Sequence, residues 1–168
     1  MKKVSLLILL ILLFSACSTT KNPRPKPLPV KIQHKSSYHL KKKNYVTTKL
    51  FLSYEKWLGT NYCYGGVDKN GVDCSALVQS IYKEAFNIKI PRTTKAQIKI
   101  GKRVSKKDLK EGDLLFFKTS YKTLHSAIYL ERGEFIHASS KHGVTLSSIH
   151  NPYWRAKYYQ ARRLLYEK

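Results

Sequence analysis

One cysteine, Cys74, lies where a helix is expected to begin. Asp73 occupies the preceding N-cap position, and the apolar residues between Ser75 and Phe86 fall on one helical face. The dipole and free N–H groups of a helix N-terminus stabilise a thiolate, and the same N–H groups can donate to an oxyanion. The position predicts a nucleophile, although the carboxylate of Asp73 opposes the thiolate. An inert, buried cysteine is the alternative interpretation.

Two histidines on successive apolar-alternating segments supply a base for this thiol. The segments predict a β-hairpin with Gly133 as the left-handed residue of a three-residue loop. This loop length puts His125 and His137 on one face, with Ala127 opposite His137 and His125 at the diagonal position. Two imidazoles near a helix-borne cysteine make a nucleophile, a base and an orienting group. For His125 alone, an ordinary surface histidine is the alternative. The other histidines show no comparable setting.

The same three side chains could also bind zinc. However, Cys74, His125 and His137 supply no obvious acid to work with a metal-bound water, and the sequence has no C-x-x-C pair. No metal and no cofactor is therefore expected. A disulfide between Cys63 and Cys74 is possible in an oxidising compartment, but it would consume the predicted nucleophile. We therefore favour free thiols.

The elements that must position these groups follow from the hydrophobic patterns. Apolar residues at helical spacing predict a first helix over 46–58, ended by Gly59, and a second over 75–86, with a short helical stretch over 93–100. Period-2 alternation then predicts short strands over 113–117, 126–130, 134–138, 143–147 and 158–165. Helices followed by strands indicate an α+β fold, with N-terminal helices packed on an antiparallel five- to six-stranded sheet.

The first 44 residues are predicted to lie outside this domain. Residues 1–16 combine a basic start, an apolar stretch too short to span a bilayer and small residues before Cys17, which is the layout of a secretory signal. Residues 17–44 are basic and proline-rich, a composition that favours an extended tether. A membrane-spanning segment and a docking site for a partner are the respective alternatives. The folded domain is expected over 45–168.

The net charge of +22 predicts attraction to anionic surfaces. A secreted protein does not normally meet nucleic acid, so we expect no nucleic-acid partner. The anionic partners expected for a secreted protein are instead phospholipid, lipopolysaccharide and the carboxylates of wall peptides. Because the basic residues are spread along the chain, a solvated cationic surface is the preferred interpretation.

The string LFSAC, which ends at Cys17, resembles the lipobox of bacterial lipoproteins. The resemblance implies cleavage before Cys17 and acylation of its side chain, and therefore a membrane partner through the N-terminal lipid. Phe14 departs from the small aliphatic residue that is usual at its place. Ser18 implies sorting to the outer membrane, with the protein facing the periplasm of the bacterial envelope. An ordinary signal peptide with a passenger cysteine is the alternative.

The domain itself resembles the NlpC-type cell-wall peptidases, which are papain-like cysteine endopeptidases of bacterial peptidoglycan. The resemblance runs through about 57–165 and rests on the motifs GTNYCYGGVDKNGVDCSALVQSIYKEAF, IPRTT, EGDLLFF, HSAIYL, FIHAS and NPYWRAKY. It implies a papain-like fold and hydrolysis of a peptide bond in peptidoglycan stem peptides. Separately, we expect a monomer. The bond is either the one between D-glutamate and a diamino acid or a cross-link between stems. A non-catalytic peptidoglycan-binding lipoprotein and a Cys-dependent acyl or amide transferase are the alternatives.

Positions that match the family motifs imply roles for individual residues. Cys74 would be the nucleophile, His125 the general base and His137 the third polar member that orients the base. Tyr62 matches a tyrosine that lies beside the nucleophile and can assist the oxyanion.

The residues that flank the cysteine are implied to bind substrate. Asp73 and Ser75 match positions that, in some relatives, bind the free amine of the substrate or line its pocket. An ammonium contact would also explain why Asp73 is tolerated beside a thiolate. Ala76 replaces a common glycine, and Ser126-Ala127 replaces a frequent Val-Gly pair. These small departures bear on the shape of the substrate cleft.

Overall fold

The computed structural model describes residues 45–166. The predicted signal, the lipidation site Cys17 and the tether lie outside the described residues. The helices and strands are, in chain order, α1 (Tyr45–Trp57), β1 (Val67–Asp68), β2 (Gly71–Val72), α2 (Cys74–Phe86), α3 (Thr94–Gln97), β3 (Lys102–Val104), the 3₁₀ turn η1 (Lys106–Asp108), β4 (Leu114–Lys118), β5 (Leu124–Tyr129), β6 (Glu134–Ser139), β7 (Gly143–Ser148), α4 (Pro152–Lys157) and β8 (Tyr158–Arg163).

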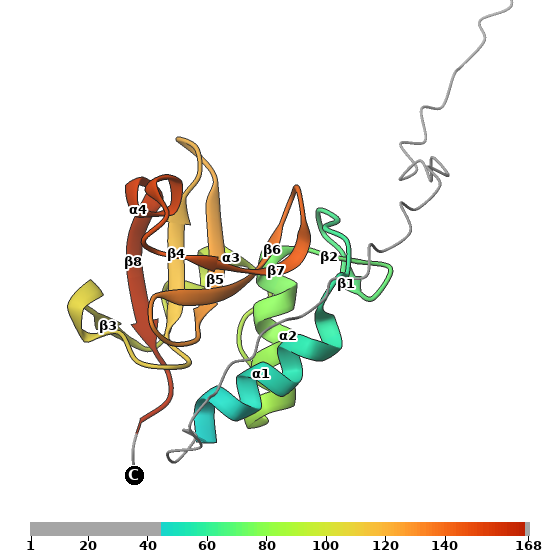
Figure 1. Cartoon of the computed structure of the whole chain (residues 1–168), viewed down its shortest axis with the longest axis horizontal. Coiled ribbons are helices and arrows are strands. Elements are labelled where there is room, and N and C mark those ends of the chain that lie inside the picture. The colour runs from blue at the N-terminus through green and yellow to red at the C-terminus, as the bar shows by residue number, and fades with distance from the viewer. Residues whose placement is uncertain (1–44, 167–168) are drawn as a thin grey trace, which may run out of the picture. The chain divides into compact units, whose positions relative to one another are not determined.

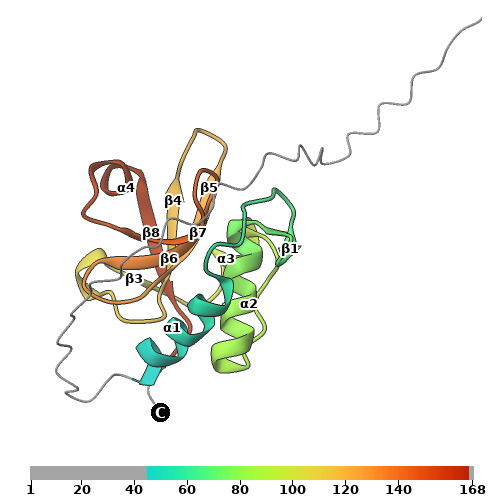
Figure 2. The ribbon, with the colours of Figure 1, turned by 45° about the vertical axis from the view of Figure 1, so that its right-hand side comes forward.

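A six-stranded antiparallel sheet forms one layer of the domain. Its strand order is β3-β8-β4-β5-β6-β7 (Figure 1). Helices α1 and α2 pack against each other, and α2 also contacts β5 and β6 (Figure 2). The predicted α+β class and the predicted sheet are therefore confirmed. Within residues 45–166, no helix is both long and apolar enough to cross a membrane.

Apolar residues fill both faces of the sheet. Between the sheet and the helices, the buried side chains include Leu77 and Ile81 of α2 with Ile128 and Ile136 of the sheet. The opposite face has a smaller core made of Leu115, Phe117, Ala127, Phe135, Ile149 and Ala161. Since alternate residues of β5 and β6 enter different cores, a shift of one residue in their pairing would exchange the two sets. The hydrophobic pattern therefore fixes the register that positions the histidines.

The predicted hairpin has the predicted register. Ile128 pairs with Ile136 and Tyr129 with Phe135, which is the pairing that sets Ala127 level with His137. Gly133 has a φ of 85°, as the left-handed position of the loop requires. Its neighbour Arg132 is also left-handed, with a φ of 51°, which the sequence did not indicate.

Several elements differ from the expectations. The helical stretch predicted over 93–100 is limited to α3, and β5 begins two residues before the predicted strand. Strands β1, β2 and β3 and helix α4 were not predicted. Helix α4 carries no regular apolar stripe, and it is fixed instead by an Asn151 side-chain cap, by Pro152 in its first turn and by Trp154 packed on the sheet. Such a helix depends on tertiary contacts rather than on sequence periodicity.

Candidate active site

Cys74 is the first residue of α2 and lies in a cleft of about 1210 Å³. The Asp73 carboxylate caps the helix, because it accepts a hydrogen bond of 2.7 Å from the N–H of Ala76. The predicted cap and the placement of the cysteine in the first turn are confirmed. The cysteine is only 9% exposed, but it lines the cleft and does not belong to the packed apolar core. This position suits a nucleophile better than an inert core residue.

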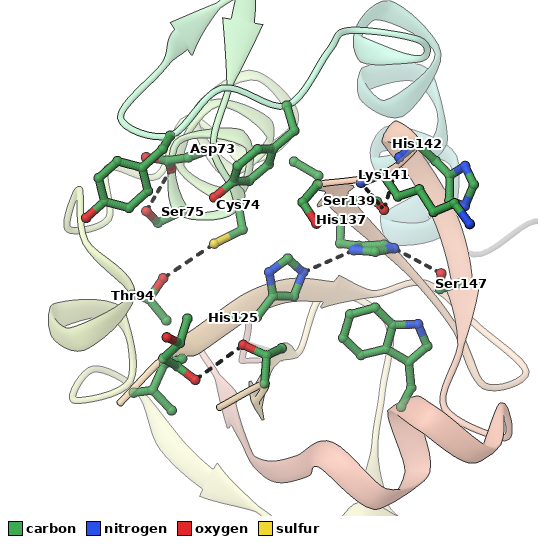
Figure 3. A pocket seen from close by; sticks show the side chains of 18 of the residues that line it. Asp73, Cys74, Ser75, Thr94, His125, His137, Ser139, Lys141, His142 and Ser147 are labelled. Atoms are coloured by element: carbon green, nitrogen blue, oxygen red, sulfur yellow. Dashed lines mark hydrogen bonds between the residues drawn. The ribbon is translucent and has the colours of Figure 1, made fainter. Parts of the chain in front are cut away.

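The two histidines of the hairpin touch each other. Nε2 of His125 lies 3.0 Å from Nδ1 of His137, and Nε2 of His137 lies 2.9 Å from Oγ of Ser147 on β7. On its other side, His125 forms a hydrogen bond with the thiol of Cys74. Figure 3 shows the resulting row, with His125 between the sulfur and His137. The structure thus brings together the three residues that the sequence proposed for catalysis, and it adds Ser147.

The electrostatic setting of this row favours a thiolate. Burial raises the pKa of Cys74, but the hydrogen bond and charge of His125, helped by the Ser126 N–H, outweigh it and lower the pKa to about 7. Burial also lowers the pKa of His137 to about 3, so this ring is neutral. A neutral His137 can accept at Nδ1 from His125 while it donates from Nε2 to Ser147. His137 therefore orients the other imidazole without competing for its proton.

Two hydroxyl groups lie on the other side of the sulfur. Oγ1 of Thr94, at the start of α3, is 3.7 Å from Sγ of Cys74 and 3.3 Å from Oγ of Ser126. Both residues are buried. When Cys74 is ionised, Thr94 can donate to the sulfur and accept from Ser126. Thr94 belongs to the IPRTT motif, but no local pattern indicates a role for it, because it lies 20 residues from the cysteine.

The carboxylate of Asp73 is balanced by Arg92, which no sequence pattern indicated. Arg92 donates to both carboxylate oxygens, at 2.9 and 2.7 Å, and Oγ of Ser75 donates to one of them at 2.9 Å. Although burial raises the pKa of Asp73, these hydrogen bonds and the guanidinium charge leave it below its ordinary value. Arg92 itself, rather than an external ammonium, already offsets the charge of Asp73 beside the thiolate.

Tyr62 lies in the same cleft, where its segment bridges to Val72 just before α2. Burial raises the pKa of its phenol, and the charges of Cys74 and Asp73 raise it further. The phenol therefore stays protonated and remains a hydrogen-bond donor. Its place matches the one implied by the resemblance.

Trp154 of α4 covers the histidines from the side away from the helices. Its ring stacks on His125 at a centroid distance of 5.4 Å and an interplanar angle of 29°, and it meets His137 edge-on at 5.0 Å. It also packs on Phe117 and Phe135 of the sheet. Trp154 therefore restricts the ring orientation of His125. The sequence signal for Trp154 is the aromatic NPYWRAKY motif, but this motif contains no nucleophile or base that would mark it as part of an active site.

Metal binding and disulfide formation were the other uses considered for these side chains. No disulfide joins Cys63 to Cys74. Within residues 45–166, no group of three or more His, Cys, Asp or Glu side chains is arranged to hold a metal ion. His142, which the sequence gave no role, lines the same cleft.

Known proteins share this sequence and fold. The profile of the NlpC/P60 family matches residues 59–163. The probable endopeptidase NlpC homolog of Haemophilus influenzae is 43% identical over 112 residues, which are 67% of this chain and 60% of that protein. The murein DD-endopeptidase MepS/murein LD-carboxypeptidase of Escherichia coli K12 is 36% identical over 168 residues, which cover 94% of this chain and 89% of that protein.

Solved structures agree with the sequence comparisons. An NlpC/P60 family protein from Bacillus cereus superposes with a TM-score of 0.63 at 30% identity, over 70% of this chain and 39% of that one. The family profile covers helices α2, α3 and α4, the residues that line the cleft and all six strands of the sheet, and it begins just after α1. The chain therefore belongs to the NlpC/P60 family.

Proposed function

We propose that this chain is a peptidoglycan endopeptidase that hydrolyses a peptide bond in stem peptides through Cys74. The activities named for its relatives, which include a murein DD-endopeptidase and a peptidoglycan DL-endopeptidase, support the substrate class. The single observation that carries the chemistry is the row formed by Cys74, His125 and His137, with a thiol whose pKa is about 7. A thiol of this acidity is about half ionised at neutral pH, and the thiolate is the nucleophilic form.

The first chemical step is attack of the Cys74 thiolate on the scissile carbonyl carbon. A C–S bond forms, and the carbonyl electron pair moves to oxygen to give a tetrahedral oxyanion. The Asp73 cap uses the N–H of Ala76, which leaves the first N–H groups of α2, nearest the sulfur, for this oxyanion. The protonated phenol of Tyr62, which lines the same cleft, supplies a further donor.

His125 transfers the proton in both steps, thioester formation and thioester hydrolysis. It donates a proton to the leaving nitrogen as the C–N bond breaks, which leaves a thioester on Cys74. It then takes a proton from water as the water oxygen attacks the thioester, and the C–S bond breaks to release a carboxylic acid and regenerate the thiolate. Neutral His137 holds the His125 ring throughout by accepting its Nε2–H.

Digestion of purified peptidoglycan tests this proposal. The full chain is expected to release fragments whose masses show addition of water across one peptide bond, while Cys74→Ala releases none and keeps the wild-type circular dichroism spectrum. Cys63→Ala, which removes the other described thiol, is the matched control and should digest at the wild-type rate. Equal digestion by Cys74→Ala would refute the mechanism. Joined fragments would identify an acyl transferase, and binding without any product would identify a non-catalytic module.

We also propose that the protein is anchored to the envelope by acylation of Cys17, with the outer membrane as its location. The support is the lipobox-like sequence, which lies outside the described residues. Cys17→Ser is expected to move the protein from the membrane fraction to the soluble periplasmic fraction of a double-membraned bacterium. Retention of the variant in the membrane fraction would contradict the anchor.

A further inference from the structure

The catalytic cleft has no carboxylate available for a substrate amine. Among the described residues that line the cleft, Asp73 is the one acidic side chain. Its two oxygens accept from Arg92, and one of them also accepts from Ser75. The pair of Asp73 and Arg92 contributes no net charge. An ammonium group on a substrate would have to break this pair to find a negative partner in the cleft.

Three lysines that form no ion pair with the described residues line the same cleft. Lys95 comes from α3, Lys122 from the loop between β4 and β5, and Lys141 from the turn between β6 and β7. All three are exposed, and none of their ammonium groups makes an ion pair with residues 45–166. We call these three residues the cationic rim. Figure 3 shows Lys141 beyond His137, on the side of the cleft away from Thr94.

The three lysines are spread around the reacting atoms. Lys95 follows Thr94, whose hydroxyl contacts the sulfur, whereas Lys122 precedes the strand that carries His125. Lys141 lies on the hairpin that carries His137 and Ser147. A peptide that places its scissile carbonyl at Cys74 must therefore pass ammonium groups on more than one side of the bond.

We propose that the cationic rim selects peptide substrates by free carboxylates on both sides of the scissile bond, and not by a free amino group. This inference rests on the proposed function. Stem peptides fit it, because D-glutamate linked through its side chain keeps an ionised α-carboxylate and a terminal residue carries another. Amidation of these carboxylates removes the charge at almost constant size. The chain therefore discriminates against amidated stem peptides.

The size of this selectivity follows from the exposure of the lysines. A single exposed ion pair changes an affinity by about two- to fivefold, because water and salt screen it. Two or three such pairs together give about a tenfold preference for the free-carboxylate peptide. Because the Debye length falls from about 10 Å at 0.1 M salt to about 3 Å at 1 M, the preference should shrink as salt is added.

The test compares two synthetic stem peptides of one sequence, with carboxylates free or amidated. Binding is measured by fluorescence anisotropy on full-length Cys74→Ala protein, which needs no turnover, and kcat/KM is measured on the active chain. We expect about a tenfold preference for the free-carboxylate peptide, loss of that preference in Lys95→Gln/Lys122→Gln/Lys141→Gln, and wild-type cleavage of the amidated peptide by this variant.

A second triple variant separates the rim from overall charge. Lys89→Gln/Lys99→Gln/Lys107→Gln removes the same number of exposed lysines away from the cleft, and it should keep the preference. Equal binding of the two peptides by the Cys74→Ala chain, or the same loss in both triple variants, would overturn the rim as a selective site. If the binding preference is present but neither peptide is cleaved, the proposed function fails while the inference about the rim stands.

Discussion

Replacing His125 by alanine tests whether the imidazole is what makes Cys74 acidic. The pKa of the thiol lies at about 7, against 9.0 for the unperturbed group, and His125 provides the two strongest influences that lower it. This difference is worth about 3 kcal/mol. Without the imidazole, burial is left opposed only by the Ser126 N–H and the Thr94 hydroxyl, so the pKa should return to its ordinary range. At pH 7 the thiolate population would then fall from about one half to about 1%, a loss of about 50-fold.

The assay is the rate of iodoacetamide alkylation at Cys74 between pH 5.5 and 9, read by mass spectrometry of the peptide that contains it. In the wild type the rate should rise as pH increases through about 7, because the reactive form is the deprotonated one. In His125→Ala the rise should shift to alkaline pH, and Cys63 in the same molecule should keep its rate. His125→Asn keeps a hydrogen-bonding group without a positive charge, so its profile should fall between the two. A rise that stays near pH 7 in His125→Ala would show that the helix N-terminus alone acidifies the thiol, and the reasoning would be wrong.

Three further predictions concern residues around this row. Thr94→Val removes a hydroxyl that lies 3.7 Å from the sulfur, and the lost hydrogen bond contributes about 0.7 kcal/mol to thiolate stability. The rate of Cys74 alkylation at pH 6 should therefore fall about threefold, and Thr94→Ser should restore it. Arg92→Ala leaves the buried carboxylate of Asp73 without its cation, so the free energy of unfolding in urea should fall by about 2 kcal/mol, and by less in Arg92→Lys. An unchanged unfolding midpoint would mean that water replaces the guanidinium. Trp154→Leu removes the ring stacked on the proposed base and should lower kcat about tenfold with little change in KM, and Trp154→Phe should recover part of the lost kcat. A change confined to KM would instead indicate a role in substrate binding.

The helix that carries the proposed nucleophile could be predicted because its signals are local. Asp73 lies three residues before the N–H that it caps, and the apolar face of α2 repeats within 13 residues. The hairpin was predictable for a similar reason, since a three-residue loop and strict alternation permit a single register. Together these local rules placed Cys74, His125 and His137 on the elements that hold them.

No local sequence pattern predicts the other residues of the site. Arg92 meets Asp73 across 19 residues, and Thr94 meets Ser126 across 32. Trp154 reaches His125 from a short helix without an apolar stripe. No periodicity links residues so far apart, and each of these side chains would be an ordinary surface residue in a different arrangement of loops.

The sequence alone determined which cysteine begins a helix and is the proposed nucleophile, which faces of the sheet are apolar and how the histidine hairpin pairs. These properties depend on backbone geometry over a few residues, where chemistry and spacing are enough. Only the tertiary structure decided that the carboxylate of Asp73 is already neutralised, that the Thr94 hydroxyl contacts the sulfur and that three exposed lysines line the cleft. Charge balance and desolvation depend on distances through space between separate segments, and folding sets those distances by packing the core.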